Sequence, residues 1–302
     1  MNRIRNNKGF SLAEMLIATG IMAIGLVMVA TIFPVGVKLT TLTTERTVGA
    51  VAADEAFAKV QLYGLRDFIG WPVTDPNTEC VDFQYVADTY DPGLDGIFGT
   101  SDDVLINPRS DWYDFQYPSS MTLDPQDRNY HWSALCRSVP TGFPGPLVPS
   151  KEIQITVFVS RKIAVGANFY GYDDTLTPVK TSAWPKPVKI EVGYDPVNPK
   201  ELTLDPADSI NTAWGNLTPA DTNRVLSFVD DGYTIVDDYY GTVYRVLDVD
   251  RTSGTILLQQ NWQPNPVDST TGLIWVVPPA VGSDRYPCVG VYQKTIYFDD
   301  IQ

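Results

Sequence analysis

A single carboxylate, that of Glu14, lies one turn inside a segment that is otherwise apolar. The run from Met15 to Val37 contains no charged residue. As a helix at ~1.5 Å per residue it covers roughly 35 Å, enough to cross a hydrocarbon core of ~30 Å. A carboxylate near the end of such a helix costs roughly 2 kcal/mol or more unless it finds a cation or lies at the interface. The chemistry expected of Glu14 is therefore ion pairing.

A second group of acids lies in the segment 91–103, with the sequence DPGLDGIFGTSDD. Carboxylates and glycines at this density suit a hard cation bound by oxygen on a tight loop, and the segment resembles the Asp- and Gly-rich calcium loops of secreted bacterial proteins. Gly93 stands where a third ligand is usual, and no closing Glu follows. The alternative is a solvated acidic turn. We predict a Ca²⁺ site formed by Asp91, Asp95, Asp102 and Asp103.

The sequence shows no arrangement typical of an enzyme. His131 is the only histidine and lies among strand-like residues, where a packed side chain is commoner than a general base. We find no Ser/His/Asp set, no Cys-x-x-Cys and no phosphate-binding loop, and no carboxylate pair is singled out. We therefore expect a protein that is not an enzyme and that uses no cofactor other than calcium.

One long helix is expected to position the N-terminal residues. Beyond Val37, apolar residues recur at helical spacing among charged ones, and no further proline interrupts the pattern. We expect a helix over residues 11–63, ending at Gly64, with a membrane half and an amphipathic half that lies against a globular head. Pro34 removes a backbone donor, which predicts a kink or local melting just before it.

Charges in front of the apolar run set the expected orientation. Arg3, Arg5 and Lys8 are basic and no acid precedes the run, so the N-terminus is expected in the cytoplasm and the remainder outside it. A secretory signal peptide would end in a small-residue cleavage site, and no clear A-x-A site occurs before Lys38.

The residues 8–14, KGFSLAE, resemble the type III signal of the type IV pilin and pseudopilin superfamily. The resemblance covers about the first thirty residues and implies that a prepilin peptidase cleaves after Gly9 and methylates the new amine of Phe10. It also implies that Glu14 pairs with the Phe10 amine of a neighbouring subunit, in an apolar filament core where such a pair is much stronger than in water. The alternative is an uncleaved signal anchor in which Glu14 is an interfacial acid.

The rest of the chain has the composition of a β-rich, loop-rich body. The 302 residues are 44% hydrophobic and include 22 Gly and 23 Pro, which suits a folded head with a sizeable core. The net charge is −14, and loss of the three basic leader residues brings it to −17. Such a charge opposes nucleic-acid binding, so no nucleic-acid partner is expected.

Strand-like runs follow the helix, several with strict alternation of apolar and polar residues. The turns at 230–232 and 250–254 are expected to close hairpins, and the proline-rich stretch 166–223 is expected to be a surface insertion or a soft boundary. The predicted strands are Val81–Val86, Tyr130–Val139, Glu152–Lys162, Val188–Tyr194, Arg224–Val229, Thr242–Val249, Thr255–Trp262, Leu273–Val277 and Val289–Phe298.

These elements predict an α+β fold in which the long N-terminal helix packs on a mainly antiparallel β-rich head. The expected segments are a cleaved leader (1–9), a transmembrane and assembly helix (10–63), a pilin-like β head (64–165) and an additional β-rich region (166–302).

Three cysteines lie on the side expected to be oxidising. A disulfide between Cys80 and Cys136 would stabilise the head by roughly 4 kcal/mol on the chain-entropy model. The alternative is three free thiols, Cys288 included.

The expected function is that of a prepilin-like structural subunit of the bacterial inner membrane, assembled with other subunits into a type IV pilus or a type II secretion pseudopilus. A large head favours a minor pilin or pseudopilin. The second hypothesis is a membrane-anchored, adhesin-like binding module that uses exposed aromatic residues such as Trp184, Trp214 and Trp262. Tryptophan is more often buried, which weighs against this second hypothesis.

Overall fold

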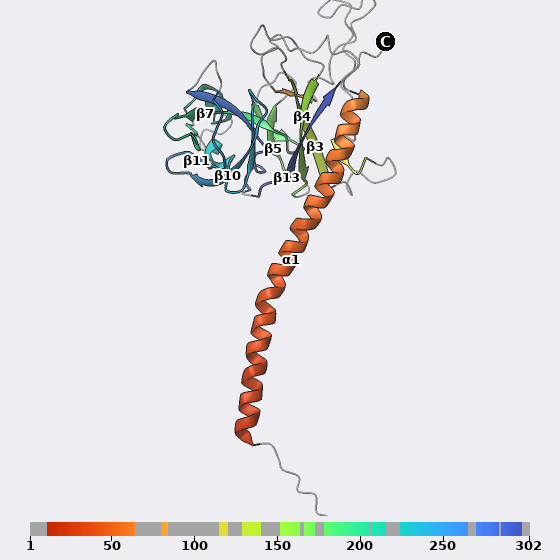
Figure 1. Cartoon of the computed structure of the whole chain (residues 1–302), viewed down its shortest axis with the longest axis vertical. Helices are drawn as coiled ribbons and strands as arrows, with labels where there is room; N and C mark the ends of the chain where they lie inside the picture. Colours follow the sequence, from red (N-terminus) through yellow and green to blue (C-terminus); the bar gives the residue numbers. More distant parts are fainter. Residues whose placement is uncertain are drawn as a thin grey trace, which may run out of the picture. The chain divides into compact units, whose positions relative to one another are not determined.

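The computed structural model describes residues 11–63, 80–83, 115–119, 129–139, 152–163, 166–172, 178–205, 207–215, 224–264, 270–283 and 285–297. The chain divides into two compact units, Met1–Val48 and Gly49–Gln302. The helix α1 (Leu12–Tyr63) runs from the first unit into the second, and every described strand belongs to the second (Figure 1).

The helix α1 is 52 residues long and agrees within one residue with the predicted range 11–63. It continues unbroken through Pro34, so the local melting predicted there is wrong. A proline removes only one backbone donor, and the i→i−4 hydrogen bonds on either side keep the helix continuous.

The first sheet is antiparallel, with the strand order β1-β3-β4-β13 and with β2 paired to β3. The strands β3 and β4 pair in register from end to end, with Trp132 opposite Val159. The strand β13 pairs with β4 with one irregularity between Cys288 and Gly290, and beyond it Phe158 lies opposite Val291. The strands are β1 (Val81–Asp82), β2 (Gln116–Tyr117), β3 (Tyr130–Ser138), β4 (Glu152–Arg161) and β13 (Cys288–Tyr297).

The last part of α1 packs on one face of this sheet. Its buried side chains are small or apolar and recur at helical spacing, and alternate residues of β3 and β4 meet them. Gly49 lets the helix approach β13, since a Cβ there would lie 2.9 Å from Tyr292 Oη and 3.2 Å from Val289 Cγ1. The helix residues of this core are Ala52, Ala53, Ala56, Phe57 and Val60, and the sheet residues include Trp132, Ala134, Cys136, Ile153, Ile155, Val157 and Val159.

Six further strands close into an antiparallel barrel with the order β10-β11-β8-β7-β12-β9. The barrel encloses a second core, to which the short helices α3 (Ser209–Gly215) and η4 (Arg224–Ser227) add Trp214 and Val225. The two-stranded sheet β5 (Phe169–Tyr172) and β6 (Pro178–Ser182) lies beside it, with Tyr170 in the same core. The barrel strands are β7 (Val188–Tyr194), β8 (Glu201–Thr203), β9 (Thr234–Asp237), β10 (Val243–Asp250), β11 (Thr255–Leu258) and β12 (Thr271–Val276).

A third core joins the barrel to the other face of the first sheet. Leu135 and Phe158 of the sheet pack there against Val236, Trp275 and Val277 of the barrel. The first sheet is therefore covered on both faces, by α1 on one and by the barrel on the other.

Two expectations from the sequence are corrected. The run Arg224–Val229 is not a strand but begins with the 3₁₀ helix η4, because its buried residues Val225, Phe228 and Val229 recur at helical spacing. The stretch 166–223 is not a surface insertion in its described part, since Ile190 and Leu202 lie in the barrel core.

The predicted turns occur, and the predicted division of the head stays a prediction. Residues 250–254 join β10 to β11, and Gly254 has φ +72° with Leu204 O against the place of a Cβ. The turn at 230–232 precedes β9 but does not join two strands. The first sheet draws β3 and β4 from before residue 165 and β13 from the end of the chain.

Candidate functional site

Glu14 and Ser11 form a reciprocal hydrogen-bonded cap at the start of α1. The Ser11 amide donates to Glu14 Oε2 at 2.9 Å, and the Glu14 amide donates to Ser11 Oγ at 3.2 Å. This arrangement is a capping box, which satisfies two backbone donors that a helix start leaves without partners. The S-x-x-E spacing of Ser11 and Glu14 is the sequence pattern of a capping box. The sequence-based prediction for Glu14 was ion pairing alone and missed this cap.

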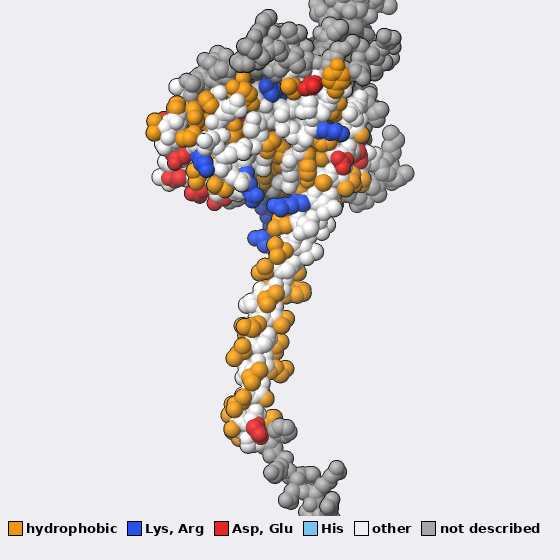
Figure 2. Space-filling view, in the orientation of Figure 1, with side chains coloured by type: hydrophobic (Ala, Val, Ile, Leu, Met, Phe, Trp, Pro, Cys, Tyr) orange, Lys and Arg blue, Asp and Glu red, His pale blue; other side chains and the backbone are white. Residues whose placement is uncertain are grey.

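The helix beyond this cap presents apolar side chains to its surroundings. Every residue from 11 to 44 is exposed, with Ile32 at 69% and Phe33 at 71%. Figure 2 shows hydrophobic side chains along this part of the helix. Among the described residues, the range Leu12–Gln61 is the one helix long and apolar enough to cross a membrane, with a mean hydropathy of 2.4 in its most apolar window. A contiguous exposed apolar surface of this kind marks a site of contact with a membrane or with another protein.

Small residues and threonines make the same surface suited to close helix contact. A Cβ added at Gly20, Gly25 or Gly36 would find no atom within 4 Å, so these positions are open to another helix. Between residues 40 and 47, five threonine hydroxyls donate to the carbonyl four residues earlier at 2.9–3.0 Å, so these hydroxyls are satisfied within the helix.

Other predicted site residues lie outside the described part of the chain. These are the processing residues Gly9 and Phe10 and the predicted calcium ligands Asp91, Asp95, Asp102 and Asp103. Within the described ranges, no group of three or more His, Cys, Asp and Glu side chains could hold a metal ion.

His131 is a packed core residue, as expected. Its ring stacks on that of Trp184 at 5.3 Å between centroids, and burial together with nearby Lys186 lowers the pKa of His131 to about 3. An imidazole that stays neutral and buried at neutral pH is poorly placed to act as a general base.

The three tryptophans considered for ligand binding are also core residues. Trp184, Trp214 and Trp262 expose 9%, 3% and 3% of their surface. An adhesin-like module would need exposed aromatic rings at these three positions, and the three rings are buried.

The cysteines are free thiols, which is one of the two alternatives that the sequence left open, the other being a disulfide between Cys80 and Cys136. Val81 lies opposite Cys136, and strand alternation places Cys80 in the core on the barrel side and Cys136 in the core on the helix side. Cys288 is on β13, three strands from β1 and so roughly 14 Å away at ~4.8 Å per strand, beyond the ~7 Å limit between bridged Cα atoms. Burial raises the pKa of Cys288 to about 12 and that of Cys80 well above its usual value.

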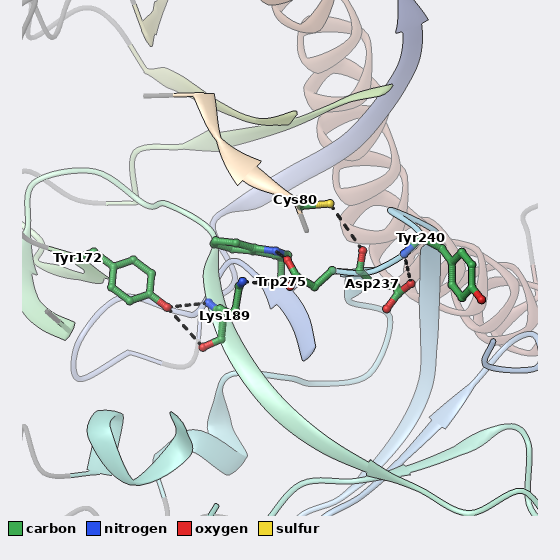
Figure 3. A network of polar contacts seen from close by, with 7 residues as sticks. Cys80, Tyr172, Lys189, Asp237, Tyr240 and Trp275 are labelled. Atoms are coloured by element: carbon green, nitrogen blue, oxygen red, sulfur yellow. Dashed lines mark hydrogen bonds and ion pairs between the residues drawn. The ribbon is translucent and has the colours of Figure 1, made fainter. Parts of the chain in front are cut away.

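A buried polar joint, formed by the turn 237–241 and the side chains around it, connects the barrel to the first sheet (Figure 3). The Cys80 amide donates to Asp238 O at 3.1 Å, and Arg137 Nη1 donates to Tyr240 O at 2.7 Å. From β13, Gln293 Nε2 donates to Gly241 O at 2.6 Å. Three segments of the first sheet therefore bind the backbone of one barrel turn.

Two consecutive buried acids belong to this joint and differ in their partners. Asp238 pairs with Lys189 Nζ at 3.0 Å and accepts from Trp275 Nε1, while Asp237 Oδ2 accepts from the Tyr240 amide at 2.6 Å. Burial raises the pKa of Asp237 to about 7, with the neighbouring Asp238 adding to the rise. Sequence reasoning missed both acids, because acids beside a turn are usually solvated.

The comparisons with known proteins concern the N-terminal segment. Residues 4–30 match the family model described as prokaryotic N-terminal methylation motif. This motif is the prepilin-type signal that is typical of the type IV pilin and pseudopilin superfamily, so the predicted resemblance is confirmed over this segment. The matched range includes Gly9, Phe10 and Glu14. No curated protein matches the chain significantly.

Proposed function

We propose that the protein is a prepilin-like structural subunit that is processed after Gly9 and assembled through its N-terminal helix. The observation that carries this proposal is the methylation motif at 4–30 at the start of a helix whose residues 11–44 are all exposed. Cleavage would free the amine of Phe10, which directly precedes Ser11 and lies four residues before Glu14. The subunit is not an enzyme in this proposal.

The expected topology follows from charge and length. The basic residues before the apolar run place the N-terminus in the cytoplasm, and the head lies outside the inner membrane. After processing, neighbouring subunits cover the exposed helix in a type IV pilus or a type II secretion pseudopilus. The large head favours a minor pilin or a pseudopilin over a densely packed major subunit.

The role proposed for Glu14 is a charge that pairs with the Phe10 amine of a neighbour. The capping box gives this proposal a rival, because loss of Glu14 also removes a helix cap worth roughly 1 kcal/mol. Three variants separate the two roles. Glu14→Gln keeps a capping side chain but removes the charge, Ser11→Ala removes the cap but keeps the charge, and Glu14→Ala removes both.

The experiment follows membrane insertion, leader cleavage and incorporation into filaments by cross-linking in cells. We expect all three variants to be inserted and cleaved, with Glu14→Ala and Glu14→Gln absent from filaments and Ser11→Ala incorporated. Incorporation of Glu14→Gln would show that the charge is dispensable. Gly9→Val is expected to retain the leader, and a mature wild-type protein that still begins at Met1 would overturn the proposed processing.

We also propose that the acidic segment 91–103 binds Ca²⁺ through Asp91, Asp95, Asp102 and Asp103. Four carboxylates in thirteen positions repel one another, and a divalent ion relieves that repulsion. An ion present at a hundred times its Kd and bound only by the folded state adds ~2.7 kcal/mol to stability. Thermal melting of the full chain in calcium and in chelator, with Asp95→Ala beside wild type, tests this; equal melting temperatures in both buffers would contradict it.

A further inference from the structure

Polar side chains form a row across four strands on the barrel-facing side of the first sheet. Strand register places Gln116 of β2 opposite His131 of β3, and His131 opposite Ser160 of β4. Ser160 in turn lies opposite Cys288 of β13. Residues directly opposite in antiparallel strands point to the same face, with Cβ atoms ~4.5–5.5 Å apart. Ser133 shares this face, two residues along β3 from His131. We call these five residues the polar row.

Four polar atoms of the polar row are buried without a strong hydrogen-bond partner. Gln116, His131, Ser133 and Ser160 expose 3%, 1%, 5% and 1% of their surface. Within the described part of the chain, Gln116 Oε1, His131 Nδ1 and Ser133 Oγ have no hydrogen-bond partner, and Ser160 Oγ has only the weak contact with the Cys288 thiol opposite it. Buried polar atoms in folded proteins almost always have a partner, so four in one row indicate that something polar lies among them.

The neighbouring side chains do not supply that partner. The rings of Trp184 and Phe115 stack on His131, with centroids at 5.3 Å and 6.2 Å. The Cys288 thiol hydrogen-bonds the Ser160 hydroxyl and donates to Gly290 O at 3.5 Å, but a thiol is a weak hydrogen-bonding group and does not reach Ser133 of β3. The partner must therefore be small, polar and able both to donate and to accept.

We infer that the polar row is a buried water site, with one water molecule held between His131, Ser133 and Ser160. Water offers two donors and two acceptors, which match an imidazole nitrogen and two hydroxyls. Buried waters typically make about three hydrogen bonds, the number that these three side chains supply. The water molecule links β3 to β4 on the barrel side of the sheet, where His131 of β3 lies opposite Ser160 of β4. Gln116 Oε1, at the end of the row, accepts from this water or from a second one.

Thermal melting of the full mature chain in detergent tests the inference, because the two alternatives change the melting temperature in different directions. If water fills the row, Ser133→Ala removes one of its hydrogen bonds, and the melting temperature falls by about 2–4 °C. If the row is dry, the same substitution removes an unpaired hydroxyl and the melting temperature stays or rises, which would overturn the inference. Thr156→Val is the matched control on the same face of the sheet, because Thr156 Oγ1 accepts from Gln293 Nε2 at 2.9 Å and its loss lowers the melting temperature in either case.

Oxygen-17 relaxation dispersion gives a direct count of long-lived internal water. We expect Ser133→Ala, and the double variant Ser133→Ala with Ser160→Ala, to lose at least one such molecule relative to wild type, with Thr156→Val unchanged. An equal count in wild type and in Ser133→Ala would overturn the inference even if the double variant does not fold.

Discussion

Alternate residues of the same two strands, β3 and β4, make the two faces of the first sheet, and the two faces meet their neighbours in different ways. Towards α1 the strands present Trp132, Ala134, Ile155 and Val157, all buried among apolar side chains. Towards the barrel they present His131, Ser133, Arg137, Thr156 and Ser160, which are buried and polar, together with Leu135 and Phe158. One sheet therefore has a dry face and a polar face.

The interactions on the two faces differ in strength and in how strongly they depend on direction. Burial of apolar surface is strong but non-directional, so the helix face holds α1 without fixing its partners atom by atom. Hydrogen bonds in a buried site are directional, and an unmade one is costly. The barrel face therefore selects one docking position, in which the backbone of the turn 237–241 meets Arg137 and Gln293.

The largest expected effect is on the helix face. Phe57 exposes 7% of its surface in the core between α1 and the sheet, and Phe57→Ala should destabilise the head by roughly 3–5 kcal/mol through lost burial and a cavity. Chemical denaturation followed by tryptophan fluorescence measures it. The matched control is Phe33→Ala, at a position 71% exposed in the same helix, which should leave head unfolding unchanged. Equal effects of the two variants would contradict the packing of α1 on this face.

The next effect concerns the polar joint. Arg137→Met removes the donor to Tyr240 O at 2.7 Å and to Gln154 Oε1 at 3.2 Å, and hydrogen bonds from a charged group contribute roughly 1.5–3 kcal/mol. We expect a loss of this size in chemical denaturation. Arg251→Met is the control, because its ion pair with Asp230 is exposed and should contribute nothing measurable. A neutral Arg137→Met would remove the directional role assigned to the barrel face.

The elements with strong local patterns could be predicted from the sequence. The bounds of α1 and of the strands β3, β4, β7, β10 and β13 were predicted within one residue. Along these strands β-branched and aromatic residues are frequent, which favours the strand conformation. The strands β5, β6, β8 and β9 have three to five residues, too few for a period to show. Closure of the barrel depends on distant pairs such as that of β7 with β12, which no local pattern specifies.

The functional residues also divide into those that a local motif predicts and those that depend on tertiary contacts. The prepilin-type signal around Gly9, Phe10 and Glu14 is local, and the motif match at 4–30 confirms its type, whereas the calcium prediction remains untested. The acids Asp237 and Asp238 become special only because Lys189, Trp275 and the first sheet bury them. Their role depends on tertiary contacts and could not be predicted from neighbouring residues.

Two buried titrating groups, Asp237 of the polar joint and His131 of the polar face, should have opposite effects on the pH dependence of stability. The pKa of Asp237 is raised from 3.8 to about 7 and that of His131 is lowered from 6.5 to about 3. Between about pH 4 and 6.5, folded Asp237 keeps a proton that the unfolded chain releases, so its contribution to stability falls as pH rises. Folded His131 lacks a proton that the unfolded chain binds, so its contribution rises with pH. The two slopes, each at most ~1.4 kcal/mol per pH unit, therefore cancel.

Single variants should expose each slope. Relative to wild type, Asp237→Asn should make unfolding free energy rise more steeply with pH over this window, because only His131 then contributes. His131→Gln should make it fall with pH up to about pH 7. Denaturant titrations at half-unit pH steps measure both. Parallel curves for the two variants would show that neither group has the protonation state assigned to it.

The smallest effect expected is at the edge of the polar face, on β13. Gln293 Nε2 donates to Gly241 O at 2.6 Å and to Thr156 Oγ1 at 2.9 Å, so Gln293→Leu should cost ~1 kcal/mol in denaturant unfolding. Thr295→Val, two residues along the same face and also exposed, serves as the control and should change nothing. Because Gln293 is partly accessible, water is its competitor for both bonds. A neutral Gln293→Leu would mean that water replaces the amide at no cost, and the turn 237–241 would then depend on Arg137 and the apolar contacts of Leu135 and Phe158 for its position.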